Sequence, residues 1–68
     1  MPALATAPAY TAFEVLVHTP TQPSKEPRTI LVATEQKGQD ELAYWKRRGY
    51  HAELYGGGAG QYDLLATT

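Results

Sequence analysis

The stretch QDELAYWKRRGY, residues 39–50, decides the fold, because it predicts a helix of about three turns in a chain whose other segments have strand patterns. Asp40 and Glu41 fall in its first turn, where the positive end of the helix dipole favours carboxylates. Three cations fall in its last turn, where the dipole favours positive charge: Lys46, Arg47 and Arg48. The polar residues around Gly38 are expected to form the turn that precedes this helix.

The end of the helix is also predicted by the sequence. Gly49 stands where a left-handed residue commonly ends a helix, and Tyr50 is then expected to fold back over Trp45. Leu42 and Trp45 lie three residues apart and share one face of the helix. We therefore expect Trp45 to be largely buried and to anchor the helix on the strand of residues 10–18.

Four segments flank the helix with strand patterns. Residues 10–18, YTAFEVLVH, alternate with a period of two, whereas residues 29–34, TILVAT, predict a strand buried on much of both faces. Residues 51–55 and 61–66, HAELY and QYDLLA, predict a hairpin around the five-residue loop GGGAG. The side chains of this hairpin that are expected to point inward are Ala52, Leu54, Tyr62, Leu64 and Ala66.

Together these elements predict an α+β fold, ββαββ, with one helix packed on a mainly antiparallel sheet of three to four strands. The helical connection can serve as a crossover, which allows the second and third strands to run parallel with the first between them, although the sequence leaves the strand order open. Residues 10–68 form the predicted single domain, and residues 1–9 form a predicted flexible arm. The proline-rich segment of residues 19–27 is expected to be an exposed connection.

Composition limits the classes of protein to which the chain can belong. With 68 residues, of which 43% are hydrophobic and 19% charged, it has room for one thin core. It has no cysteine, which excludes disulfides, so a partner subunit is a candidate source of further stability. The formal net charge of -1 lacks the positive excess of typical nucleic-acid-binding domains. No apolar run reaches the roughly 20 residues that span a bilayer, so we expect a cytoplasmic protein without membrane contact.

The glycine-rich stretch YGGGAGQY, residues 55–62, has two main interpretations. A phosphate cradle needs a helix directly after the loop, because the helix N-terminus supplies free N–H groups. Here a strand-like segment follows, and the pattern matches neither GxGxxG nor GxxxxGK[ST]. A hairpin tip is therefore favoured over phosphate binding, and a loop that becomes ordered against a partner is a third alternative.

The segment YWKRRGY, residues 44–50, combines three cations with three aromatic side chains. Tyr and Arg are enriched at interface hot spots, which favours a protein-binding patch, while stacking rings and cations also suit single-stranded nucleic acid. A solvated helix end explains the cations without any partner. The predicted partner-binding residues are Tyr44, Lys46, Arg47, Arg48, Tyr55 and Tyr62.

Another group of residues depends on the sheet. If Phe13 and Leu54 face the helix, alternation places carboxylates and imidazoles on the opposite face: Glu14, His18, His51, Glu53 and Asp63. Such a mixture is the raw material of a metal or acid/base site, but any sheet with one solvated face shows polar residues there. Since no HxH or HxxxH spacing joins the histidines, we predict no metal, no cofactor and no catalytic residue.

These patterns predict a small non-enzymatic accessory or regulatory protein that binds another protein, as inhibitors and adaptors do. The open sheet face, with Leu16 and Leu65 expected on it, makes a second copy of the chain one candidate partner. The alternatives are a nucleic-acid-binding module at the basic helix end and a metal or acid/base site on the open face.

Overall fold

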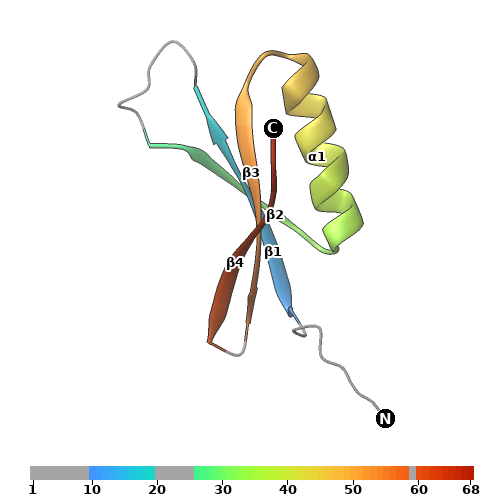
Figure 1. Ribbon diagram of the computed structural model, residues 1–68, viewed down its shortest axis with the longest axis vertical. Helices are drawn as coiled ribbons and strands as arrows, with labels where there is room; N and C mark the ends of the chain where they lie inside the picture. Colours follow the sequence, from blue (N-terminus) through green and yellow to red (C-terminus); the bar gives the residue numbers. More distant parts are fainter. Residues whose placement is uncertain (1–9, 20–25, 59) are drawn as a thin grey trace.

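Five elements follow one another in the computed structural model, which describes residues 10–19, 26–58 and 60–68. They are β1 (Ala12–His18), β2 (Arg28–Val32), α1 (Glu35–Arg47), β3 (His51–Gly58) and β4 (Gln61–Thr67). The strands form one antiparallel sheet in the order β2-β1-β3-β4, and α1 lies along one side of it (Figure 1). The predicted ββαββ fold is confirmed. The predicted arm of residues 1–9 and most of the proline-rich connection lie outside the described residues.

The order of the strands follows from the position of the helix. Both β2 and β3 pair antiparallel with β1, so they run parallel to each other with β1 between them. Parallel strands require a crossover connection, and α1 makes it. The structure therefore has the arrangement that the sequence allowed, and it decides the strand order.

The core lies between α1 and the two central strands. Its buried side chains are Val15, Val17, Leu42, Ala52 and Leu54. Trp45 packs against this cluster but is only partly buried, which corrects the expectation that it is largely buried. Its indole N–H donates to the Glu41 carboxylate (3.0 Å) and the Arg28 guanidinium lies over its ring, so polar groups of the surface and not the core surround part of it. The expectation that residues 29–34 are buried on both faces is wrong, because β2 is an edge strand on which Leu31 is 78% exposed.

The helix begins at Glu35, four residues before the predicted start. Thr34 is its N-cap, and the Thr34 hydroxyl accepts a hydrogen bond from the backbone N–H of Lys37 (3.1 Å). Gly38, expected in a turn, lies buried inside the helix, and Asp40 and Glu41 therefore follow the first turn. Glycine is suited to this position because the helix and β3 approach closely there: a β-carbon at Gly38 would overlap the buried Leu54 side chain of β3.

The helix ends as predicted. The N–H groups of Gly49 and Tyr50 donate to the carbonyls of Lys46 and Trp45, both at 3.0 Å, and Gly49 has a φ of 82°. The rings of Trp45 and Tyr50 meet edge to face with centroids 5.1 Å apart. Within the described ranges, no helix is long and apolar enough to cross a membrane.

The glycine-rich stretch is not a five-residue loop, which corrects the predicted hairpin. β3 continues to Gly58, which pairs with Gln61, so only two residues separate the strands. Pairing of β3 with β1 extends to Gly57, where the N–H of Thr11 donates to the Gly57 carbonyl (2.9 Å). A strand and not a helix follows, so the stretch lacks the helix N-terminus that a phosphate cradle uses.

A bulge in β4 reverses part of the predicted alternation. Leu54 pairs with Ala66 and Tyr55 with Leu64, so Leu65 is the extra residue. Leu65 and Ala66 pack against the core, whereas Tyr62 and Leu64, expected inside, are exposed. The expectation that Leu65 lies on the outer face is wrong for the same reason.

The close approach of α1 to β3 predicts that Gly38→Ala destabilises the protein. Alanine gains about 1 kcal/mol of helix propensity, but overpacking a core typically costs about 1–3 kcal/mol. Because Leu54 is fully buried and has little room to move, we expect a net loss of about 1–2 kcal/mol in the free energy of unfolding, measured by urea denaturation.

The matched control is Gln39→Ala, at an exposed position of the same helix, which should change the free energy of unfolding by less than about 0.5 kcal/mol. The double variant Gly38→Ala, Leu54→Val should show coupling, since the smaller side chain relieves the overlap. Stabilisation by Gly38→Ala alone would contradict the close helix–sheet contact.

Candidate functional site

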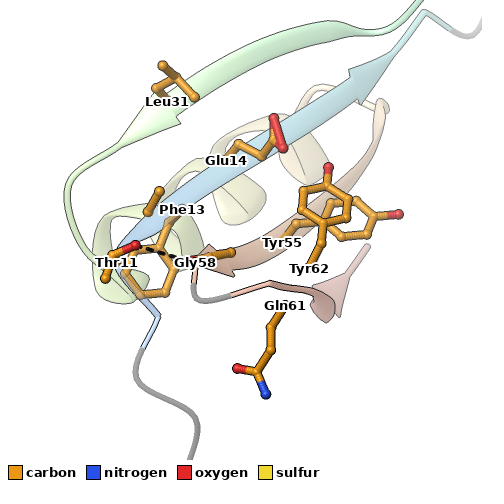
Figure 2. A pocket seen from close by; sticks show the side chains of 10 residues that line it. Thr11, Phe13, Glu14, Leu31, Tyr55, Gly58, Gln61 and Tyr62 are labelled. Carbon is orange, nitrogen blue, oxygen red and sulfur yellow. Dashed lines mark hydrogen bonds between the residues drawn. The ribbon is translucent and has the colours of Figure 1, made fainter.

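The sheet has one face covered by α1 and one face without a layer over it, in the described part of the chain. Figure 2 shows the uncovered face, with α1 behind the sheet. Strand alternation and register place nine larger side chains there. We call this surface the open face, and its residues are Glu14, Leu16, His18, Leu31, His51, Glu53, Tyr55, Tyr62 and Leu64.

Large apolar side chains on the open face remain in contact with solvent. Leu31 is 78% exposed, Tyr62 56% and Leu64 52%. Leu31 lies on the edge strand β2, and Tyr62 and Leu64 lie on the opposite edge strand β4. The rings of Tyr55 and Tyr62 stack with centroids 4.7 Å apart and an interplanar angle of 4°. Several large exposed apolar side chains on one face commonly mark a site of interaction.

A shallow groove of about 240 Å³ opens on this face. Glu14 lies between Leu31 on one side and the two stacked tyrosines on the other, as Figure 2 shows. The groove is smaller than the roughly 300–1,000 Å³ of typical small-molecule pockets. Its size suits a single side chain of a larger partner.

The carboxylate of Glu14 changes the chemistry of the neighbouring phenol. Hydrogen bonding and charge from this carboxylate favour the neutral form and raise the pKa of Tyr62 to about 12. Burial, followed by the charge of Glu53, raises the pKa of Tyr55. The groove is therefore lined by neutral phenols beside an acidic group.

Charge is divided between the two faces of the molecule. Arg28 lies over the Trp45 ring (5.8 Å) and Arg48 over the Tyr44 ring (4.3 Å), both on the helix side. The other described cations belong to α1 itself. Among the described residues, the open face thus carries Glu14 and Glu53 but no lysine or arginine, which makes it attractive to cations.

The two histidines of the chain meet at one end of the open face. His18 and His51 are cross-strand partners, with ring centroids 5.1 Å apart. Nε2 of His18 lies 3.1 Å from one carboxylate oxygen of Glu53, and Nε2 of His51 lies 3.5 Å from the other. Hydrogen bonding to His18 holds the pKa of the Glu53 carboxyl below its usual range.

Alternation had placed five polar residues on this face, and the structure brings three of them together: His18, His51 and Glu53. Glu14 lies on the open face too, but in the groove and not in the histidine cluster. Asp63 is on the other side of the sheet, which corrects the prediction: it pairs with the buried Gly56 and accepts a hydrogen bond from Tyr10 (2.7 Å). The bulge at Leu65 is the cause, because it shifts the alternation of β4.

The predicted partner-binding residues fall into two separate groups. Tyr55 and Tyr62 stack on the open face, whereas the basic helix end lies on the opposite side of the sheet. Sequence reasoning missed Leu31 as a surface residue, because a continuous apolar run resembles a buried strand. The four predicted residues at the exposed helix end are Tyr44, Lys46, Arg47 and Arg48.

Comparison with known proteins gives no match, since no family model, curated protein or solved structure is significantly similar to the chain. The residues of the open face are therefore the basis for the function proposed below.

The position of Glu14 predicts that the Tyr62 phenol is the last of its pair to ionise. In NMR titrations of tyrosine-labelled protein, Tyr62 should titrate near 12, and Glu14→Gln should move its pKa toward 10.0. Because the folded-state pKa lies above the unfolded value, the neutral phenol stabilises the fold below pH 10, and this contribution is lost as the pH rises toward 12. An unchanged Tyr62 titration in Glu14→Gln would show that the two groups do not interact.

Proposed function

We propose that the chain is a small non-enzymatic accessory or regulatory protein that binds another protein through its open face. The observation that supports this most directly is the exposure of Leu31, Tyr62 and Leu64 on a sheet face that no other layer covers within the described residues. The described residues include only five buried core side chains, so the domain gains little free energy from burial of apolar surface. A partner that covered the exposed leucines and Tyr62 would add to that burial.

The chemistry of the face indicates what the partner presents. Glu14 stands in an apolar groove without a cationic neighbour from the described part of its own chain. A lysine or arginine side chain fits this setting, because its aliphatic stem would contact Leu31 and the tyrosine rings while its charge met the carboxylate. The proposed occupant is therefore a protein segment with basic residues next to aromatic or aliphatic ones.

The basic helix end is the weaker candidate for binding. Arg48 already covers the Tyr44 ring, and Arg28 and Tyr50 both lie against Trp45. These contacts reduce the aromatic surface on which unstacked bases would lie, so the nucleic-acid alternative has less support than the open face.

Panning a displayed random-peptide library on the immobilised chain tests the proposal. Enriched peptides should carry Lys or Arg beside aromatic or aliphatic residues. For a synthetic peptide of this class, Leu31→Asp should weaken binding by about tenfold or more, as expected for an interface anchor. Glu14→Gln should weaken binding less and reduce its dependence on salt, because only the charge is removed.

The double variant Arg47→Glu, Arg48→Glu is the matched control on the opposite side of the sheet and should leave peptide affinity unchanged. Enrichment of acidic peptides, or loss of binding only in this control, would contradict the open face as the binding surface. Concentration-dependent dimerisation that Leu31→Asp abolishes would identify a second copy of the chain as the occupant of the same face.

A further inference from the structure

The histidine cluster has the composition and spacing of a metal-binding site. His18 of β1 and His51 of β3 lie directly opposite each other, and Glu53 is two residues further along β3 on the same face. One donor atom from each of these three side chains lies within 4.8 Å of the other two. The backbone ladder therefore brings two imidazoles and a carboxylate together, although β1 and β3 are far apart in the sequence.

The two histidine-to-carboxylate separations are close to those of ligands that share an ion. Ligand atoms about 2.1 Å from a tetrahedral zinc ion are about 3.4 Å from one another. The two histidine-to-carboxylate distances, 3.1 and 3.5 Å, lie on either side of this value. Small rotations of the two imidazoles would bring both Nε2 atoms within bonding distance of one ion. Both side chains have room to rotate, since His18 is 38% exposed and His51 is 51% exposed.

A further contact orients the carboxylate. The Tyr55 hydroxyl donates a hydrogen bond to the same Glu53 oxygen that faces His18 (3.3 Å). Hydrogen bonds of this kind commonly fix the ligands of metal sites. The site also rests on the two central strands, which pair with each other through His18 and His51.

We propose that His18, His51 and Glu53 bind one divalent first-row transition-metal ion, with Zn²⁺ as the reference ion. Two imidazoles with one carboxylate suit Zn²⁺, Co²⁺, Ni²⁺ or Cu²⁺, whereas Mg²⁺ and Ca²⁺ prefer oxygen ligands throughout. The exposed side of the cluster leaves coordination positions to water. This site does not depend on the proposed protein partner, because its ligands are not those that contact the groove.

The test is calorimetric titration of the tag-free chain with Zn²⁺, supported by the visible spectrum of bound Co²⁺. We expect saturation at one ion per chain, no comparable binding of Mg²⁺, and Zn²⁺-induced shifts of both imidazole nitrogens in NMR spectra. The variants His18→Ala, His51→Ala and Glu53→Gln should each lose more than tenfold in affinity. Tyr55→Phe should lose about tenfold, as expected when an orienting hydrogen bond is removed.

Glu14→Gln is the matched control, since it neutralises the other open-face carboxylate and should leave Zn²⁺ affinity unchanged. Circular dichroism of every variant separates loss of a ligand from loss of the fold. The NMR shifts of the wild-type chain test the site even if a variant does not fold. Failure to saturate at one ion, absence of shifts at either histidine, or unchanged affinity in a folded Glu53→Gln variant would each overturn the proposal. Failure to saturate at one ion would leave the proposed peptide-binding function unaffected.

Discussion

Helix α1 lies close against β3 because Gly38 carries no side chain at the point where Leu54 rises from the sheet. The rest of the core is arranged around this contact, with Val15 and Val17 of β1 beside it and Leu42 above it. A chain of 68 residues has only one layer of side chains with which to exclude water. A wider gap between helix and sheet would therefore uncover the whole apolar interior rather than a part of it.

Because the chain supplies one helix to four strands, only one face of the sheet is covered in the described residues. This geometry also divides the charges. The described lysines and arginines lie on α1 or against its aromatic rings, while Glu14 and Glu53 project from the other face. The proposed peptide site and the proposed metal site both follow from this division, since each uses a carboxylate of the face on which the described residues include no lysine or arginine.

The bulge in β4 determines which residues reach the open face. Without the bulge, regular alternation through Leu65 would place Tyr62 and Leu64 on the same side as Ala66, where they would enlarge the core. With it, Tyr62 stacks on Tyr55 and completes the groove, while Leu65 packs inward. The edge strand thus contributes to both layers, and its apolar contribution to the open face, Tyr62 and Leu64, results from a single change of register.

The sequence by itself determined the element order and the helix ending at Gly49, because these features depend on local periodicity and capping, and the length of the helical connection allowed β1 to lie between β2 and β3. It also identified His18, His51 and Glu53 as residues of one face. Only the tertiary structure decided that Gly38 belongs to the helix, that Leu31 is exposed, and that Asp63 leaves the open face. The physical reason is that close approach, edge position and bulges depend on the neighbouring strand or helix, and no periodicity within one segment reports them.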